Sequence, residues 1–353
     1  MSKVVQVKDL LIGGGNSVVI QSMNNTLTSD VNATLNQINE LYEAGCELTR
    51  VAIPDRDHAE ALKEITAKSP IPVVADIHFD YKLALLAAQN GAAKIRINPG
   101  NIGGMDNVIK VANECKSRNI PIRVGVNSGS VDRKILEKYG GKVCSDALVE
   151  SALQAVKMLE DADFDDIVIS IKSSSPKLTI DSYRKLSSVT DYPLHVGVTE
   201  AGTIREGIIK SAVGIGALLS EGIGDTIRVS LTGNPVEEVY AAISILKALD
   251  LRTGGVKFVS CPTCGRTRVN LIELATEIER RICNLPYDIK VAVMGCAVNG
   301  PGEARDADIG IAGGDKEFLL FEKGEIIRKI PEENVVEEFV ECVKKFGEKK
   351  NGI

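Results

Sequence analysis

The sequence predicts an α/β protein in which a (β/α)8 barrel is followed by a small α+β domain. Three observations support this prediction. Short apolar runs of strand type recur eight times, amphipathic stretches of helical period separate them, and the alternation stops near Arg252. Eight such units over roughly 230 residues are typical of a TIM barrel, whereas a doubly wound open sheet, the alternative, rarely reaches eight regular units. We therefore expect a barrel domain over residues 1–251 and a second domain over residues 252–353.

The expected barrel strands are rich in Val and Ile, and several follow a Pro or Gly that ends the preceding helix. They cover residues 18–23, 48–53, 72–77, 94–99, 121–126, 166–171, 194–199 and 226–231. Amphipathic helices are expected between these strands, for example at residues 30–44, 55–68, 79–90, 105–119, 146–161, 203–220 and 236–249. A short hairpin over residues 4–12 precedes them. It ends at a Gly triplet that no helix follows, so this is a turn and not a dinucleotide fingerprint.

The helical pattern stops at R-T-G-G, and the remaining residues predict a smaller α+β unit. Its expected strands lie at residues 256–260, 289–294, 308–312, 317–322 and 325–330, and its expected helices at 267–283 and 332–346. Two Gly-rich turns in this unit carry cysteines, in V-S-C-P-T-C-G-R and M-G-C-A-V-N-G-P-G-E-A. The spacing of these cysteines predicts a metal site.

Cys261 and Cys264 form a C-x-x-C, and Cys296 and Glu303 follow after a helix and a strand. A C-x-x-C places two sulfurs on one tight turn, so both can ligate one metal centre. No His follows His195, which argues against a Cys/His zinc site. An iron–sulfur cluster with three Cys ligands leaves one iron for an exchangeable carboxylate, and Glu303 is the nearest candidate. From spacing alone, an iron–sulfur cluster, a zinc site and plain structural thiols all stay open.

The bulk composition describes an ordinary globular protein of 353 residues, with 44% hydrophobic and 25% charged residues. A net charge of −6 argues against a nucleic-acid surface. The chain start has no basic region with an apolar core, and no apolar run approaches the roughly 18 residues of a membrane span. We therefore predict a reducing, cytoplasmic location. The other cysteines are expected to be small buried apolar side chains: Cys46, Cys115, Cys144, Cys283 and Cys342.

Ionisable and amide side chains stand at the carboxyl ends of the expected barrel strands, where barrel enzymes build their active sites. Five of them are cationic. Because burying one unpaired Arg is costly, five converging cations imply an anion that the sequence does not supply. Arg forks and a Lys suit phosphate oxygens, so a small diphosphate is a good candidate. The set is Asn24, Arg50, Asp76, Arg96, Asn98, Arg123, Asn127, Lys172, Glu200, Arg228 and Ser230.

Each of these residues also has a plainer interpretation. Any single Arg could form a salt bridge to Asp76 or Glu200, but two acids cannot pair five cations. Lys172 could instead be a Schiff-base nucleophile. Asp76 and Glu200 are expected to be general acids or partners that orient the Arg forks, and the E-A-G-T turn makes Glu200 the better proton donor. His78 and His195 are expected to be core or strand-edge residues.

Long motifs in both parts of the chain resemble one enzyme family, the 4-hydroxy-3-methylbut-2-en-1-yl diphosphate synthases of the non-mevalonate isoprenoid route. Besides the two cysteine motifs they are T-R-V-A-I-P, V-A-D-I-H-F, I-R-I-N-P-G-N-I-G, V-G-V-N-S-G-S, H-V-G-V-T-E-A-G and T-I-R-V-S-L-T-G. The resemblance covers essentially the whole chain, in the short bacterial two-domain form without the insert of the plant enzymes. No ligand or strand-end position departs from the family pattern.

The resemblance implies an oxidoreductase that opens the ring of 2-C-methyl-D-erythritol 2,4-cyclodiphosphate and removes a hydroxyl, which gives (E)-4-hydroxy-3-methylbut-2-enyl diphosphate. Two electrons would come from a flavodoxin or ferredoxin. It implies a 4Fe–4S cluster on Cys261, Cys264 and Cys296, with Glu303 on the fourth iron. Asp76 and Glu200 match the acidic catalytic positions of the family. Its diphosphate-binding positions are matched by Arg50, Arg96, Arg123, Asn127, Lys172, Arg228 and Ser230.

The linker near Arg252 predicts a homodimer. The helix after the eighth strand runs back toward the bottom of the barrel, and six extended residues span at most about 20 Å. The cluster domain is therefore expected to cap the barrel of a partner in a head-to-tail twofold dimer, and the family is similarly dimeric. Two other classes stay open: a sugar-phosphate aldolase that uses Lys172 beside a structural metal domain, and a non-catalytic iron–sulfur sensor.

Overall fold

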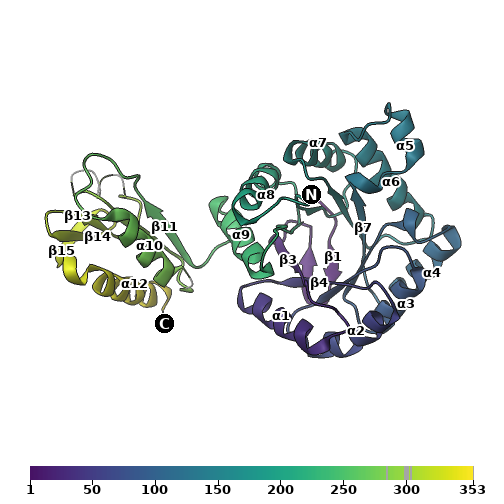
Figure 1. The fold of residues 1–353 in the computed structure, drawn as a ribbon, viewed down its shortest axis with the longest axis horizontal. Helices are drawn as coiled ribbons and strands as arrows, with labels where there is room; N and C mark the ends of the chain where they lie inside the picture. The colour runs from purple at the N-terminus through teal and green to yellow at the C-terminus, as the bar shows by residue number, and fades with distance from the viewer. Residues whose placement is uncertain (284, 298–301, 303, 353) are drawn as a thin grey trace. The chain divides into compact units, whose positions relative to one another are not determined.

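The computed structural model describes residues 1–353 except 284, 298–301, 303 and 353. The chain divides into two compact units, Met1–Arg252 and Thr253–Ile353 (Figure 1). No helix in the described part of the chain is both long enough and apolar enough to cross a bilayer.

The first unit is a closed (β/α)8 barrel, which confirms the predicted fold class. Its parallel strands follow the order β8-β7-β6-β5-β4-β3-β10-β9. The ring closes where Ile169 bridges Leu194 and its N–H donates to the carbonyl of Pro193 at 2.9 Å. The strands are β3 (Val19–Met23), β4 (Leu48–Ala52), β5 (Val73–Asp76), β6 (Lys94–Ile97), β7 (Ile122–Asn127), β8 (Ile167–Lys172), β9 (His195–Val196) and β10 (Thr226–Ile227).

Helices surround these strands, as Figure 1 shows. Several begin at a residue whose side chain caps the first turn: Asp30 accepts from the N–H of Ala33, and Ser175 from that of Leu178. Two helices, α5 and α7, lie outside the predicted ranges. The helices are α1 (Val31–Glu43), α2 (Arg56–Lys68), α3 (Tyr81–Gln89), α4 (Met105–Ser117), α5 (Arg133–Lys138), α6 (Ser145–Glu160), α7 (Pro176–Ser187), α8 (Ile204–Leu219) and α9 (Pro235–Ala248), with short 3₁₀ turns η1 (Pro99–Asn101) and η2 (Ser128–Ser130).

An N-terminal hairpin, β1 (Val5–Val7) and β2 (Leu10–Ile12), packs against the amino ends of the barrel strands. Its Val7 and Ile12 are fully buried in one apolar cluster with residues from the first halves of the strands, namely Val19, Leu48 and Val74. The interior of the barrel is therefore mainly apolar at this end, although Lys94, the first residue of β6, is buried there beside Val74. Most of the other charged side chains of the interior lie nearer the carboxyl ends of the strands.

The second unit holds a five-stranded sheet in the order β11-β12-β13-β14-β15. Strands β11, β12 and β13 are parallel to one another, β14 is antiparallel to β13, and β15 is antiparallel to β14. Helices α10 and α12 bury Ile278 and Phe339 against one sheet face, while Ala304 and Ala307 lie on the other face with Phe321. The elements are β11 (Val256–Ser260), α10 (Leu271–Ile282), β12 (Ile289–Met294), β13 (Ile309–Gly313), β14 (Glu317–Glu322), β15 (Glu325–Pro331), a 3₁₀ turn (Glu332–Asn334) and α12 (Val335–Asn351).

Both helices of this unit differ from their predicted bounds, and α12 begins at Val335, three residues after its predicted start, because Glu332–Asn334 form a 3₁₀ turn. Helix α10 begins at Leu271 and not at residue 267, because the preceding residues form a turn with the cysteine loops. In that turn the N–H of Thr267 donates to the carbonyl of Cys264 at 3.0 Å, and the N–H of Arg268 to that of Gly295 at 3.1 Å. Helix α12 continues to Asn351, five residues beyond the predicted end.

Candidate active site

The strand register decides which polar strand residues face the barrel interior. Asp76 pairs with Arg96, Arg96 with Arg123, and Asn127 with Lys172 on successive strands. Residues paired in this way point to the same face of the sheet. All of them therefore belong to one inward-facing set near the carboxyl ends of the strands. The buried members are Arg50, Asp76, Arg96, Arg123 and Lys172, between 0% and 8% exposed.

Asp76, at the end of β5, is the carboxylate that two of the arginines share. Its Oδ1 lies 3.0 Å from Nη1 of Arg96, and its Oδ2 lies 3.7 Å from Nε of Arg50. The ring of His78, more than half exposed, lies 3.5 Å from the same Oδ2. Burial alone would raise the pKa of Asp76, but the charge of Arg50, the hydrogen bond from His78 and the charge of Arg96 together hold it well below its usual range. This favours the orienting role of Asp76 over the proton-donating one.

Arg228 has a carboxylate partner that the sequence did not indicate. Glu238, in the first turn of α9, is only 4% exposed, and its Oε1 lies 3.0 Å from Nη2 of Arg228. The same carboxylate accepts the N–H of Leu231 at 2.9 Å and the hydroxyl of Ser22 at 3.0 Å. The other arm of Arg228 donates to Ser230 at 2.8 Å. The guanidinium is thus fixed from both sides.

Arg123 and Lys172 form no ion pair within the described residues, although both are nearly or fully buried. The guanidinium of Arg123 has only a long contact, 3.5 Å, to the hydroxyl of Ser170. Burial, followed by the charges of Arg50 and Arg123, lowers the pKa of Lys172 well below its ordinary value. Burial likewise lowers the pKa of Arg50, to about 10. These cations outnumber the carboxylates buried beside them, and an anionic ligand would supply the missing negative charge.

A glycine makes room for one of the arginine forks. A Cβ at Gly125, on β7, would lie 2.3 Å from Nε of Arg96, whose Nη2 donates to the carbonyl of Gly125 at 3.3 Å. No side chain larger than hydrogen fits there without displacing the guanidinium. Gly125 therefore fixes where the Arg96 fork lies.

Glu200 lies on the turn after β9, with an exposed side chain. The N–H of Thr199 donates to the carbonyl of Ser173 at 3.1 Å, so this turn runs beside the end of β8, where Lys172 stands. Glu200 has a φ of 52°, in the left-handed region that non-glycine residues seldom adopt.

Two strand-end amides turn out to be structural. Asn24 accepts the hydroxyl of Thr49 at 2.6 Å and donates to the carbonyl of Thr34, so it ties α1 to the strands. Asn98 caps the 3₁₀ turn η1 through the N–H of Gly100 at 3.2 Å. His195 is a buried core residue, as expected.

In the second unit the two cysteine loops lie against each other. The N–H of Gly295 donates to Sγ of Cys261 at 3.2 Å, and the next residue is Cys296. A Cβ at Gly295 would lie 3.0 Å from side-chain atoms of both Thr267 and Leu271, so this close approach depends on glycine. Hydrogen bonding from the backbone N–H of Arg266 lowers the pKa of the exposed Cys264 thiol, which favours its thiolate form.

The metal site itself is only partly formed by these contacts. Glu303 lies outside the described residues. Among the residues that the structure describes, no three Cys, His, Asp or Glu side chains are gathered closely enough to hold a metal. The donor set still fits an iron–sulfur cluster, because a backbone N–H already points at one sulfur and a second sulfur favours its charged form.

The remaining cysteines follow the prediction only in part. Cys46 and Cys115 are buried, and burial raises the pKa of their thiols, to about 11 and about 12 respectively. Cys283 is exposed, because it caps the C-terminal end of α10 and not its core face. Cys144 and Cys342 are half-buried.

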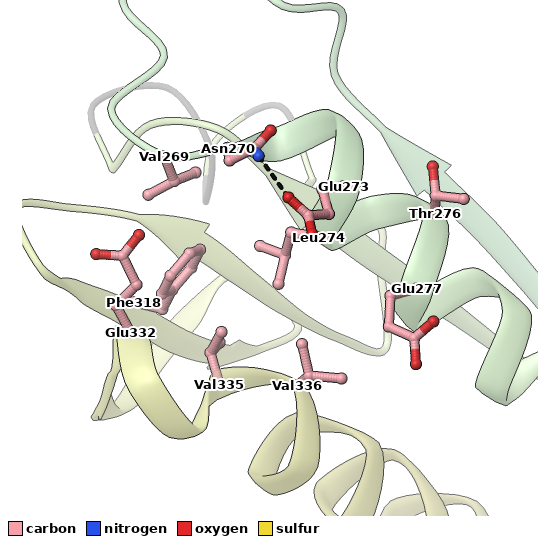
Figure 2. A pocket seen from close by; sticks show the side chains of 10 residues that line it. All are labelled: Val269, Asn270, Glu273, Leu274, Thr276, Glu277, Phe318, Glu332, Val335 and Val336. Atoms are coloured by element: carbon pink, nitrogen blue, oxygen red, sulfur yellow. Dashed lines mark hydrogen bonds between the residues drawn. The ribbon is translucent and has the colours of Figure 1, made fainter.

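Two hollows on the surface of the described residues lie apart from the predicted site residues. One, of about 540 Å³, lies between α10 and α12, where Leu274, Phe318 and Val335 form its floor and Glu273 and Glu277 its rim (Figure 2). Asn270 donates to Glu273 at its edge, at 2.7 Å. Another, of about 690 Å³, lies beside the N-terminal hairpin and includes Lys8 and Arg118. Neither is lined by a strand-end cation or by Cys261, Cys264 or Cys296.

Comparison with known proteins gives consistent results over both units. The profile of the GcpE TIM-barrel domain matches residues 2–243, and that of the GcpE protein C-terminal domain matches residues 257–345. A protein of Ruminiclostridium cellulolyticum, named 4-hydroxy-3-methylbut-2-en-1-yl diphosphate synthase (flavodoxin), is 62% identical over 339 residues, which cover 96% of each chain. A protein of the same name from Fusobacterium nucleatum is 57% identical over 349 residues, 99% of this chain and 98% of that one.

Solved structures share the barrel fold alone. Dihydropteroate synthase of Yersinia pestis superposes with a TM-score of 0.50 at 11% identity, over 71% of this chain and 100% of that one. The enzyme of the same name from Vibrio fischeri superposes with a TM-score of 0.50 at 10% identity, over 70% and 99% of the two chains.

Proposed function

The chain belongs to the GcpE family of 4-hydroxy-3-methylbut-2-en-1-yl diphosphate synthases, and we propose from this premise how its residues divide the work. The reaction converts 2-C-methyl-D-erythritol 2,4-cyclodiphosphate to (E)-4-hydroxy-3-methylbut-2-enyl diphosphate. Atom balance requires two electrons and two protons, and it releases one water. The protein must therefore hold a diphosphate, deliver protons and accept electrons at the same place.

The barrel unit is the substrate domain in this proposal. The observation that carries it is the surplus of positive charge at the strand ends, where Asp76 and Glu238 are the buried carboxylates beside five cations. The substrate brings the missing negative charge, and Arg forks grip phosphate oxygens with two parallel hydrogen bonds. The proposed binding residues are Arg50, Arg96, Arg123, Asn127, Lys172, Arg228 and Ser230.

Proton delivery falls to Glu200 in this proposal. Its exposed carboxylate can exchange protons with solvent, and its turn runs beside Lys172 at the end of β8. Asp76 acts differently, since its low pKa keeps it ionised and able to orient Arg50 and Arg96. The basic pocket holds the diphosphate as the C–O bond at the ring breaks.

The C-terminal unit is the iron–sulfur domain in this proposal. Cys261, Cys264 and Cys296 would hold a 4Fe–4S cluster, with Glu303 on the fourth iron. Such a cluster supplies the two electrons when it is bound. The two cysteine loops already meet where the N–H of Gly295 donates to Sγ of Cys261, so the three thiolates would come from adjoining loops.

The electron donor and the assembly follow from the same premise. The relatives' printed name specifies flavodoxin, so a flavodoxin is the proposed donor, with a ferredoxin as the alternative. The enzyme is proposed to act in the cytoplasm as a homodimer in which the C-terminal domain of one subunit caps the barrel of the other.

Anaerobic purification from iron-replete cells tests the cluster, and substrate turnover tests the pocket. We expect a brown protein that absorbs at about 400 nm and contains iron and sulfide. Replacing Arg123 by Met should reduce turnover by at least about a hundredfold, because a charge-assisted contact to phosphate is lost from a buried site. The matched change Arg118→Met, on the exposed end of α4, should leave turnover intact. A colourless, zinc-containing preparation would overturn the proposal.

A further inference from the structure

Lys94, the first residue of β6, is a buried cation that the proposed chemistry does not use. It lies two residues before Arg96 on the same strand and pairs with Val74, so it faces the barrel interior below Arg96. Its side chain is 0% exposed, and within the described residues its Nζ has no hydrogen-bond partner. A fully charged ammonium in such a place would lack both water and a counter-ion.

The groups around Lys94 make the charged form still less favourable. From β7 and β4 it meets the positive charges of Arg123 and Arg50. On β9, His195 feels the positive charge of Lys94; it is 0% exposed, and its Nε2 also has no hydrogen-bond partner among the described residues. Asp76, the buried carboxylate of neighbouring β5, is already shared by Arg50 and Arg96. No carboxylate of the described residues forms an ion pair with Lys94.

We propose that Lys94 is uncharged in the substrate-free barrel and takes up a proton from solvent when the substrate's diphosphate binds above it. This rests on the proposed role of the barrel pocket. The step adds one proton to the amine and breaks no bond. It needs no other reactant.

Residue chemistry explains why a lysine carries this role. An arginine keeps its proton in every protein environment, whereas a buried lysine gives up its proton readily. Burial, with the charges of Arg123 and Arg50 in addition, lowers the pKa of Lys94 well below its ordinary value. A bound diphosphate replaces that repulsion by attraction and reverses the balance. Lys172, one of the proposed binding residues, responds in the same direction.

Lys94 would therefore add positive charge only when the ligand is present. The empty barrel is spared an unpaired buried charge, and the loaded barrel gains one more attraction for its anion. Affinity for the substrate should then weaken as the pH rises, because binding takes up a proton and the concentration of protons falls.

Calorimetric titration with 2-C-methyl-D-erythritol 2,4-cyclodiphosphate tests this, in buffers that differ in ionisation enthalpy. Each phosphorus of this ligand carries one strongly acidic oxygen, so the ligand itself does not change protonation near neutral pH. The wild-type protein should take up protons on binding, and Lys94→Met should take up about one fewer. The slope of log Kd against pH should be smaller for Lys94→Met than for the wild type, by about one. Lys82→Met, on the exposed start of α3, is the matched control and should behave as wild type.

Folding of the variant is checked by its unfolding transition as a function of pH. Because the pKa of Lys94 is lowered in the folded state, the unfolded chain holds that proton more tightly. Wild-type stability should therefore rise with pH up to the ordinary lysine pKa of about 10.4, and the rise should be smaller for Lys94→Met, in which Lys172 still contributes in this way. Equal proton uptake by wild type and Lys94→Met would overturn the inference. Absence of any binding by the wild type would instead overturn the proposed function.

Discussion

At the scale of single residues, the pocket depends on how each cation is fixed. Arg228 is held by Ser230 on one arm and by Glu238 on the other, so its fork is oriented before any ligand arrives. Glu238 also binds the N–H of Leu231, and this ties the start of α9 to the segment after β10. Its carboxylate is therefore a positioning group, although it is not expected to touch the substrate.

Replacing Glu238 by Gln tests this positioning role. The amide oxygen can still accept the N–H of Leu231 and Nη2 of Arg228, but the carboxylate charge that strengthens the bond to Arg228 is lost; a hydrogen bond to a charged group is worth about 1.5–3 kcal/mol. We expect KM to rise roughly tenfold with little change in kcat, because the contact to the diphosphate is the same in ground and transition states. Glu237→Gln, one residue earlier on α9, is the control. A fall in kcat alone would contradict the interpretation.

Asp76 gives a prediction about stability and pH. Its pKa is lowered in the folded state, so its contribution to stability is fully present above the unfolded value of about 3.9 and is lost as the pH falls toward the folded one. Asp76→Asn should destabilise the barrel by about 3 kcal/mol at pH 7, because Arg50 and Arg96 lose their shared partner.

Denaturant unfolding at pH 7 and at lower pH measures this difference. The gap between wild type and Asp76→Asn should narrow below about pH 4. An added diphosphate should restore part of the variant's stability, since it supplies the missing negative charge. A gap that stays constant with pH would show that the carboxylate charge is not what stabilises the barrel.

At the scale of elements, strand β7 is shaped around a neighbour's side chain. A methyl group at Gly125 would collide with the Arg96 guanidinium at 2.3 Å. Gly125→Ala should therefore weaken substrate binding by about tenfold, comparable to the loss of one charge-assisted contact. Gly216→Ala on α8 adds the same methyl in open space and should leave binding unchanged while stabilising the helix by about 0.5–1 kcal/mol. Equal affinities of the two variants would refute the steric argument.

Gly295, in the turn between β12 and the second cysteine loop, is likewise a position where a methyl group would be too close to its neighbours. Gly295→Ala would press on Thr267 and Leu271 and push the C-x-x-C loop away from Cys296. We expect the protein to hold its iron about tenfold more weakly, measured as iron and sulfide per chain after anaerobic chelator challenge. Gly265→Ala lies within the C-x-x-C loop but meets nothing within 4 Å, so it should keep its iron.

Local patterns predict the elements well and their cross-chain partners poorly. Strand periodicity located all eight barrel strands, and parallel register then brought Arg50, Asp76 and Arg96 together. The sequence did not indicate Glu238 as a site residue because it lies on a helix. It contacts Arg228 only because the segment between β10 and α9 folds back toward the end of β10. Nor did it indicate Lys94, because the importance of Lys94 depends on burial and on register, neither of which a strand motif displays. A low pKa at Lys172 would also suit a Schiff-base enzyme, so family membership and not the pocket decides against that alternative.

At the scale of the whole molecule, Arg252 shows where the chain leaves the barrel unit. Nη1 of Arg252 lies 3.2 Å from Oε2 of Glu47, and Glu47 directly precedes β4. The chain therefore leaves the barrel unit at the amino ends of the strands, whereas the cations stand at the carboxyl ends. Residues 253–255 lead directly into β11, and such a short linker reaches only about 10 Å. The proposed homodimer, in which the partner's C-terminal domain completes the active site, is compatible with so short a linker.

Heterodimers of differently tagged chains decide between completion by the same chain and by the partner. A Cys296→Ser chain paired with a Glu200→Gln chain leaves one intact barrel and one intact C-terminal domain on different subunits. If the partner completes the site, this heterodimer should have about half the activity of the wild-type dimer, because one of its two sites is whole. The reciprocal control pairs a chain carrying both changes with a wild-type chain. If the partner completes the site, this control heterodimer should be inactive, since each of its two sites contains either the damaged barrel or the damaged C-terminal domain. The opposite pattern, an inactive first heterodimer and a half-active second one, would place each complete site within a single chain.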